Sequence, residues 1–510
     1  MPIPKLHEPE TIKESPTLEQ LLDRLDSLDL IQSQRLLQVL VENRPELIDE
    51  VDRYINLVVE PVSIEKSAKS PRRRTTIDTS SFRRQVWEIL EDAMEGWEGG
   101  WYDEEDRVGD ELTKLIQEAD EFTKGGEAAN ALAILEAITG TCADGWDKVS
   151  DYSDFYEISL LLDRALAEAI LTAELTSEEK VDIQINIEYW EEELTASFET
   201  SSEALRQGWD YPPLQRVLEG KIDEFGAWEG EPPEYADELA EVRLQILERQ
   251  ERYEEYLYLA RAEVQTKSYL TMLARLGRIE EAMEAANKYM KSMEQAKALA
   301  EILREKGALA QALEVARSGL TLQGHCQYAL GDWASNLAEG LGDRQVALDT
   351  RILAFEARPS FDDYQKIEEL AGDNWQAMKA KILADLRSND GWRARDAKVD
   401  IFLHEGLVED AIATVAEISY YHSELIHRVM DAAIDSYPDW VISNAIPPAE
   451  DIMNRGKARD YSDAVKWLKK ARAAYLAAGR QVEWSAYRAE LKTIHGRKYK
   501  LMGLFNEGGL

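Results

Sequence analysis

The sequence predicts an all-α fold, namely a right-handed α-solenoid built of TPR-like helix-turn-helix repeats. The first observation is a pattern of glycine, four residues, alanine and an apolar residue, of which we assign six copies to helix-turn-helix turns. The glycines of these copies are Gly126, Gly277, Gly307, Gly342, Gly372 and Gly406. From Gly277 onward they are 30, 35, 30 and 34 residues apart, which is the length of one helix-turn-helix repeat. The second observation is that strand signals are nearly absent, since even the alternating segment 184–190 has helix-forming flanks.

The segment 273–286 illustrates why this spacing predicts a turn between two paired helices. Gly277 follows one helix and takes the turn, because a positive φ is cheap only for a residue without a Cβ atom. Glu280 and Glu281 then fall in the first turn of the next helix, where carboxylates suit the helix dipole. Ala282 is small enough to let the paired helix approach closely. Segment 247–256 is predicted to be a degenerate copy, with Glu251 in the glycine position.

The first 81 residues are predicted to form a small helical unit followed by a linker. Residues 1–60 carry leucines at helical spacing, whereas residues 61–81 are polar and basic. The arginines of this segment and its edge are Arg72, Arg73, Arg74, Arg83 and Arg84. They are candidates for contact with nucleic acid, although the segment is expected instead to fold onto an acidic surface or to remain solvated.

Three further parts follow along the chain. Residues 82–234 are predicted to be an acidic, irregular helical region, with breaks at 207–213 and 228–233. Residues 235–415 form the regular TPR-like array, whose concave surface is expected to bind an extended segment or a helix. Residues 416–510 form a C-terminal helical module with breaks at Pro438 and at Pro447-Pro448. Its tail from position 495 is basic and then apolar, and either caps the last repeats or extends to a partner.

Charge is distributed unevenly over these parts. The formal net charge is −40, and residues 87–250 alone contain 44 acidic and 11 basic residues. Such a field repels a phosphate backbone and attracts basic surfaces. Residues 87–250 could therefore be a docking face for a basic protein, a mimic of a nucleic acid, or simply a solvated helical surface. The tail carries the remaining candidates for a basic contact, namely Arg497, Lys498 and Lys500.

The sequence lacks the common signatures of catalysis and of metal binding. It contains no phosphate-binding loop, no G-x-S-x-G and no H-E-x-x-H, so we expect no enzyme and no cofactor. Cys142 and Cys326 are 184 residues apart and are expected to be buried free thiols. His422 and His427 are five residues apart and so do not share one face of a helix. Without a signal peptide or a long apolar run, the expected location is the cytoplasm.

Several segments resemble the helical region of bacterial SWIM zinc finger proteins. The most specific are AKVDIFLHEGLVEDAI at 397–412, RVMDAAIDSYPDWVI at 428–442 and the closing stretch 456–505. The resemblance covers most of the chain and is looser before about residue 240. It implies a helical platform that works beside AAA+ ATPases and von Willebrand A-type proteins. The C-x-C…C-x-H ligand set of that family is absent, so the resemblance implies no zinc site here.

The leading hypothesis is therefore a cytoplasmic, non-enzymatic scaffold that mediates protein–protein interaction. The alternative is a nucleic-acid-associated protein, which would act through the basic residues between Arg72 and Arg84 and between Lys492 and Lys500. A third hypothesis is an acidic mimic of nucleic acid formed by residues 87–250. The sequence predicts no membrane-bound partner.

Overall fold

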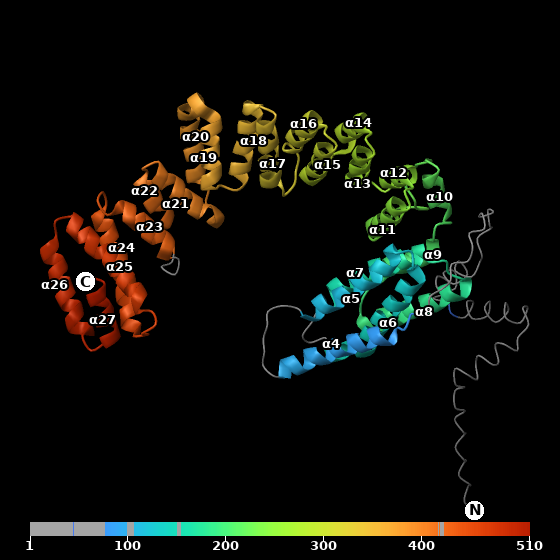
Figure 1. Ribbon diagram of the computed structural model, residues 1–510, viewed down its shortest axis with the longest axis horizontal. Coiled ribbons are helices and arrows are strands. Elements are labelled where there is room, and N and C mark those ends of the chain that lie inside the picture. The colour runs from blue at the N-terminus through green and yellow to red at the C-terminus, as the bar shows by residue number, and fades with distance from the viewer. Residues whose placement is uncertain (1–43, 45–76, 99–106, 150–154, 417, 419–422) are drawn as a thin grey trace, which may run out of the picture. The chain divides into compact units, whose positions relative to one another are not determined.

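The computed structural model describes residues 44, 77–98, 107–149, 155–416, 418 and 423–510 (Figure 1). Throughout these residues the regular elements are helices, and the β-type contact is an isolated bridge between Ser292 and Gln323. The predicted all-α class is therefore confirmed. The predicted helical unit 1–60, apart from residue 44, and the arginines at positions 72–74 lie outside the described residues.

The chain divides into two compact units, which are named unit 1 (Met1–Gln265) and unit 2 (Thr266–Leu510). The boundary falls inside the predicted array 235–415, so the first helices of that array belong to unit 1. Unit 1 contains 63 acidic and 26 basic residues, whereas unit 2 contains 36 acidic and 33 basic residues. The charge asymmetry therefore follows the boundary between the units.

Unit 1 is a helical assembly in which α6 is the most buried element. Four helices pack against α6, and buried residues such as Leu135 and Ile138 fill the space between them. The four neighbours are α4, α5, α7 and α8. The helices of unit 1 are α4 (Ser80–Glu98), α5 (Arg107–Lys124), α6 (Ala128–Gly145), α7 (Tyr156–Thr172), α8 (Ser177–Leu194), α9 (Glu199–Gln207), α10 (Pro212–Leu218), α11 (Ala236–Arg249) and α12 (Tyr253–Ala262).

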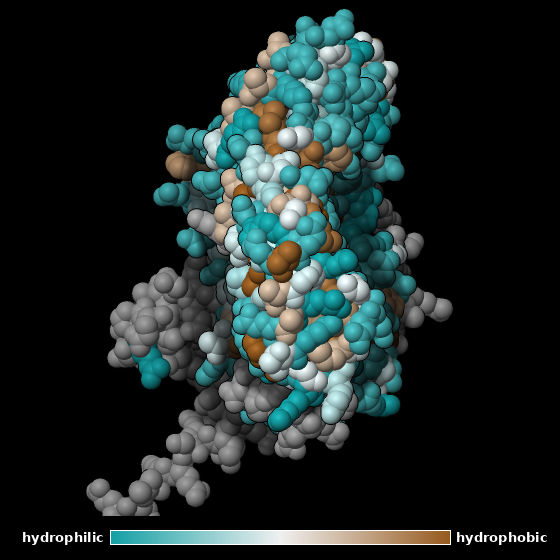
Figure 2. All heavy atoms as spheres, turned by 90° about the vertical axis from the view of Figure 1, so that its left-hand side faces the viewer, coloured by the Kyte–Doolittle hydropathy of each residue, from teal (hydrophilic) through white to brown (hydrophobic). Residues whose placement is uncertain are grey.

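Unit 2 begins with a succession of helix pairs. Each helix contacts its partner in the pair, and several also contact the corresponding helix of a neighbouring pair, as α15 contacts α16, α13 and α17. This contact pattern is that of a solenoid. The pairs are α13 (Thr266–Arg275) with α14 (Ile279–Tyr289), α15 (Met293–Glu305) with α16 (Leu309–Gly319), α17 (Gln327–Gly340) with α18 (Arg344–Ala357), α19 (Phe361–Ala371) with α20 (Trp375–Ser388), and α21 (Arg395–His404) with α22 (Val408–Val415). On the face drawn in Figure 2, apolar side chains are scattered among hydrophilic ones.

The turn within a pair has one recurring geometry. Gly277 has φ 78°, its amide donates to the Ala274 carbonyl oxygen, and the amide of Arg278 donates to the Leu273 carbonyl oxygen, both at 3.0 Å. This is the Schellman arrangement, which satisfies the last carbonyl groups of a helix. The same two hydrogen bonds and a positive φ recur at Gly126, Gly307, Gly342, Gly406 and the degenerate position Glu251. The alanine five residues after each of these five glycines is fully buried.

Gly372 departs from the predicted repeat turn. Its φ is also positive, at 54°, but a 3₁₀ turn follows it and Ala377 is exposed rather than packed against a paired helix. Trp375 is buried near the start of α20 instead. Arg344 from α18 caps the end of α19 by donating to the carbonyl oxygens of Glu369 and of Leu370, the latter at 2.7 Å. A side chain from the preceding pair thus replaces the backbone bonds of the Schellman turn.

The last five helices continue the packing of unit 2. They are α23 (Ser423–Ala433), α24 (Pro438–Arg455), α25 (Tyr461–Ala477), α26 (Gln481–His495) and α27 (Tyr499–Glu507). Because α23 contacts both α21 and α22, the predicted module 416–510 is continuous with the array. The basic tail folds as α27 and packs on α25 through buried Leu501 and Phe505, which is the cap that the sequence offered as one alternative.

The predicted break at Pro447-Pro448 is wrong, because both prolines lie inside α24. Proline removes a hydrogen bond to the carbonyl group four residues earlier, which here belongs to Ser443 and Asn444. Both of these residues are exposed, so water can satisfy their carbonyl groups. The packing of α24 on α25 keeps the helix continuous across the prolines.

Candidate functional site

A candidate surface of unit 1 lies on α8. This helix begins with a capping box, in which Thr176 accepts from the Glu179 amide and Glu179 accepts from the Thr176 amide. Its buried side packs on α6 and α9, and includes Ile187 and Trp190, whose ring lies 6.1 Å from that of Phe198. Capping and packing therefore fix which side of α8 faces the solvent.

The opposite side of α8 combines carboxylates with large apolar groups. Residues three and four positions apart share one side of a helix, and six exposed residues do so here. Ile185 is 52% exposed and Tyr189 is 42% exposed, one helical turn apart. We name this surface the α8 face, and its residues are Glu178, Asp182, Ile185, Tyr189, Glu192 and Glu193.

Hydrogen bonds to α6 hold the α8 face in place. The Tyr189 hydroxyl donates to Asp144 at 3.0 Å, and this bond raises the pKa of the tyrosine because it favours the neutral form. The Asn186 amide donates to Glu136 at 3.2 Å. Burial raises the pKa of Glu136 even so, since this bond offsets only part of the cost of desolvation. The tyrosine ring is thus positioned before any partner arrives.

The helix that follows α8 is anchored by a buried carboxylate. Asp163 from α7 accepts hydrogen bonds from the amides of Thr200 at 3.0 Å and Ser201 at 2.7 Å, in the first turn of α9. Burial raises the pKa of Asp163, although these bonds lower it. A carboxylate from a neighbouring helix therefore caps α9 and ties it to α7.

The α8 face has no basic residue of its own. Lys180 is half-buried near the start of the helix, and the remaining charged groups on the exposed side are acids. Carboxylates around an apolar centre attract a cationic segment electrostatically and offer it area to bury. The face lies inside residues 87–250, the segment whose charge suggested a docking face for a basic protein.

The predicted basic contacts fall in both units. Arg83 and Arg84 are exposed at the start of α4, and the charge of Arg83 offsets part of the rise that burial causes in the pKa of Glu136, so this arginine lies near a carboxylate of unit 1. Arg497 and Lys500 are exposed near the C-terminus, beyond the end of α26. Lys498 is half-buried and donates to the Met453 carbonyl oxygen at 2.5 Å, where it caps α24.

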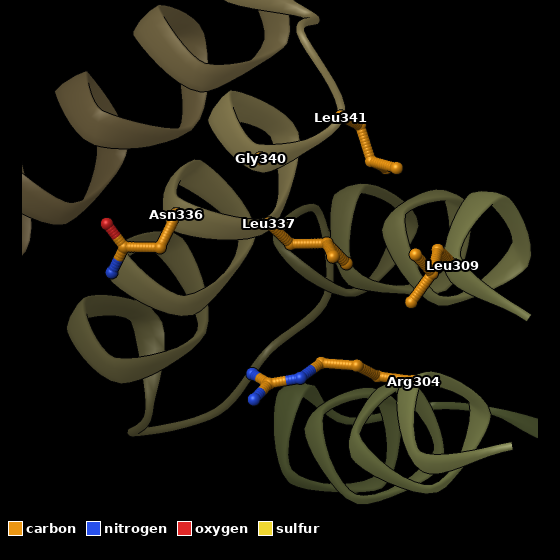
Figure 3. A pocket seen from close by; sticks show the side chains of 6 residues that line it. All are labelled: Arg304, Leu309, Asn336, Leu337, Gly340 and Leu341. Carbon is orange, nitrogen blue, oxygen red and sulfur yellow. The ribbon is translucent and has the colours of Figure 1, made fainter. Parts of the chain in front are cut away.

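A hollow of about 410 Å³ lies among three helices of unit 2 (Figure 3). Its walls come from the end of α15, the start of α16 and the end of α17, within the predicted array. Arg304 supplies the charged group, while the Asn336 amide oxygen already accepts from Arg351 at 2.8 Å. The lining residues are Arg304, Leu309, Asn336, Leu337, Gly340 and Leu341. The hollow suits an apolar side chain, but it contains no pair of groups for acid–base chemistry.

Among the residues that the structure describes, the cysteines and histidines form no reactive centre. Cys142 is buried, and burial raises the pKa of its thiol to about 12, whereas Cys326 is only half-buried and so departs from the prediction. His427 packs against Trp467, with 4.2 Å between ring centroids, and His422 lies outside the described residues. Within the part of the chain that the structure describes, no cluster of three or more His, Cys, Asp or Glu residues could hold a metal ion.

Comparison with protein-family models and with curated proteins finds no match for the chain. Among the described residues, no helix has the length and apolar character needed to cross a membrane. Sequence reasoning assigned the acidic charge to a region and missed the two apolar residues that distinguish the α8 face. The signal was present in the segment 184–190, where Ile185 and Tyr189 are four residues apart between acidic neighbours.

Proposed function

We propose that this chain is a non-enzymatic, cytoplasmic scaffold that binds a basic segment of a partner protein on the α8 face. The observation that carries the proposal is the placement of Ile185 and Tyr189, both about half exposed, among four carboxylates on one side of a capped helix. The partner segment would be amphipathic, with an apolar side against these two residues and cationic side chains toward the carboxylates. The helical array would hold further partners along unit 2.

The mixed character of the face favours a protein segment over a purely ionic contact. Burying the remaining exposed part of a large apolar side chain contributes about 1 kcal/mol, which is less than a factor of ten in affinity. By the same relation, two such residues together increase the affinity by about one to two orders of magnitude. The carboxylates make association with a cationic segment faster and favour cationic over anionic partners. This electrostatic contribution becomes weaker as the salt concentration rises.

The direct test uses a fluorescent amphipathic helical peptide of leucine and lysine, here named the Lys peptide, with anisotropy as the readout on the full chain. The double substitution Ile185→Ser and Tyr189→Ser removes the apolar centre, and should weaken binding at least tenfold. Because both side chains are exposed, the circular dichroism spectrum should not change. A matched control removes the exposed apolar residue Phe225 by Phe225→Ser and should leave affinity unchanged.

A second pair of variants tests the role of charge. One variant converts the four acids of the α8 face to amides (E178Q, D182N, E192Q and E193Q). The control converts four exposed acids of α4 and α5 (E88Q, E91Q, D92N and E118Q). Only the first should remove most of the salt dependence of binding, because charges beyond a Debye length of about 8 Å are largely screened at physiological salt.

The outcomes separate the scaffold from the nucleic-acid mimic. A mimic depends on the array of carboxylates, so its binding would be lost in the amide variant and retained in the Ile185→Ser, Tyr189→Ser variant. Equal loss in the α8 and control amide variants would indicate general attraction to unit 1 and would contradict a site on α8. Absence of binding at low salt would also contradict the proposal.

A further inference from the structure

The helix α26, in unit 2, is covered on one side only. Its buried residues Trp484, Leu491 and His495 lie on the side that packs on its neighbours, and α26 contacts α25 and α27. Four exposed residues lie on the opposite side, at intervals of four, three and four positions. We name this row the α26 ridge, and its residues are Val482, Ala486, Ala489 and Thr493.

The α26 ridge has the composition of a helix contact and not of a solvated surface. A surface helix normally carries charged residues on the side opposite its buried stripe, and the ridge carries none. Val482 is 83% exposed. Alanines such as Ala282 and Ala312 are fully buried where the helices of this unit meet, because small side chains allow close approach. The ridge therefore resembles a packing surface that still lacks its covering helix.

The ridge is bordered by cations that are free of ion pairs. Arg488 and Lys492 flank one edge of it, and Arg497 and Lys500 follow in the connection to α27 and its first turn. The described ion pairs of unit 2 include none of these four residues. In a chain with a net charge of −40, residues 456–510 contain 12 basic and 5 acidic residues.

The other edge of the ridge carries two exposed acids, Glu483 and Glu490, and ends at the exposed Ile494. Glu483 lies there and pairs with Arg480 at 2.6 Å, which in turn also pairs with Asp439. Tyr499, the first residue of α27, is 86% exposed. The surface therefore combines an uncharged ridge with one cationic edge and one acidic edge.

We propose that the α26 ridge is the docking site for an amphipathic helix of a partner protein with an acidic flank. The apolar side of that helix would pack along the ridge, and its carboxylates would face Arg488, Lys492, Arg497 and Lys500. This site is separate from the α8 face, which would bind a partner segment of the opposite, positive charge. The scaffold would then hold an acidic partner on unit 2 and a basic partner on unit 1.

Two other occupants fit the surface less well. A nucleic acid would engage the cations through its phosphates and gain nothing from Val482, Ala486 and Ala489. In an antiparallel two-fold pair of α26 helices the same edge of each helix would meet. Lys492 would then approach the cationic edge of its own counterpart, which is unfavourable.

The test uses two peptides and two variants of the full chain. The probes are a labelled amphipathic helical peptide of leucine and glutamate, named the Glu peptide, and the Lys peptide described above. Ala489→Arg places a bulky charge in the middle of the ridge without touching the core. This substitution should weaken binding of the Glu peptide at least tenfold and leave the affinity for the Lys peptide unchanged. Ala377→Arg, at an exposed alanine of α20, is the matched control and should change neither affinity.

A charge variant completes the experiment. The triple substitution Lys492→Glu, Arg497→Glu and Lys500→Glu should also weaken binding of the Glu peptide at least tenfold. This effect should become smaller at high salt, because salt screens the charges. Failure of the Glu peptide to bind at low salt would overturn the proposal, whatever the Lys peptide does. Equal loss in the Ala489→Arg and Ala377→Arg variants would overturn it as well.

The same material distinguishes the other occupants. If a labelled single-stranded RNA binds in a manner that depends on the three cations but not on Ala489, the surface is a nucleic-acid site and the proposal is wrong. If sedimentation of the unmodified chain gives a dimer that Ala489→Arg dissociates, a second copy covers the ridge and the proposal is equally wrong. A monomer that binds the Glu peptide and not the RNA supports it.

Discussion

The guanidinium group of Arg351 in α18 lies 2.8 Å from a carboxylate oxygen of Asp363 in α19, and the two side chains are only 6% and 5% exposed. The same guanidinium donates to the Ser335 hydroxyl at 3.2 Å and to the Asn336 amide oxygen at 2.8 Å, both in α17. One buried cation therefore joins three successive helices of unit 2. Because a buried charge is costly when unpaired, this network links the stability of adjacent repeats.

The first prediction is that Arg351→Met destabilises unit 2 by about 3–5 kcal/mol, the usual cost of leaving one partner of a buried pair alone. Hydrogen exchange should accelerate in α17, α18 and α19 and change little in α25 to α27. Arg317→Met, at an exposed arginine of α16, is the control and should change the free energy of unfolding by no more than about 0.5 kcal/mol. An equally small effect at Arg351 would mean that solvent reaches the network.

The second prediction concerns Glu251, which has φ 58° although it is not glycine. The left-handed conformation costs most residues about 1–2 kcal/mol, and glycine avoids this cost at the expense of chain entropy. Glu251→Gly should therefore stabilise unit 1 by about 0.5–1 kcal/mol, measured by urea unfolding. Glu254→Gly, in the first turn of α12, is the matched control and should destabilise it by about the same amount.

The third prediction contrasts two glycines of unit 2, one in the turn between α15 and α16 and one at the end of α17. Gly307 has φ 80° and open space around it, so Gly307→Ala introduces backbone strain without a clash and should cost about 1 kcal/mol. Gly340 is the last residue of α17 and also has open space, so Gly340→Ala should stabilise the unit by about 0.5 kcal/mol. Thermal unfolding of both variants is the measurement, and shifts of the same sign would contradict the assignment.

These cases indicate how much of the fold the sequence determines locally. The Schellman turns could be predicted because glycine and the alanine five residues later lie in the same segment, as at Gly277 and Ala282. Gly372 could not be distinguished by that rule, because Arg344 from another helix pair supplies its cap. The continuity of α24 through Pro447 was also unpredictable, since it depends on packing against α25.

The candidate surfaces were predictable only in part, for the same reason. The net charge of residues 87–250 was enough to predict an acidic docking face within that segment. It could not show which side of α8 is exposed, because that depends on which residues pack on α6 and α9. Ile185 and Ile187 are the same residue type two positions apart, and only the second is buried. The ridge on α26 was missed because valine and alanine in a helix normally indicate a buried stripe.

The fourth prediction follows from His427, which packs against Trp467 in unit 2 and has a pKa lowered to about 4, mainly by burial and then by the charge of Lys470. An unfolded histidine has a pKa near 6.5, so the unfolded state binds the proton first as pH falls. The contribution of His427 to stability is therefore present above pH 6.5 and is lost as pH falls toward 4. His427→Phe should remove this component.

Hydrogen exchange of α23 and α25 at pH 7 and pH 5 measures the effect. The difference between the native chain and the His427→Phe variant should grow in favour of the variant at the lower pH. Because other groups titrate in the same range, only this difference is diagnostic. A difference that does not change with pH would show that the imidazole becomes protonated at its ordinary pKa.

The fifth prediction concerns unit 1, where the stability contributed by one titrating group falls as pH rises, opposite to the pH dependence expected for His427. The pKa of Asp120 in α5 is raised to about 6, first by burial and then by the nearby carboxylate of Glu168 in α7, although Lys124 and Arg164 act in the opposite direction. One buried oxygen of Asp120 has no hydrogen-bond partner. The folded state therefore favours the protonated acid. Its contribution to stability is complete below about pH 4 and is lost as pH rises through 6.

Asp120→Asn should therefore stabilise unit 1 at pH 7 and have little effect at pH 4, because asparagine imitates the neutral acid. Hydrogen exchange of α5 and α7 between these two pH values is the measurement, and Glu118→Gln, at an exposed acid of the same helix, is the control. On acidification from pH 7 to pH 5, the Asp120 component should strengthen unit 1 while the His427 component weakens unit 2. If Asp120→Asn destabilises the unit at pH 7, the carboxylate is ionised there and held by Lys124 and Arg164, and the assignment is wrong.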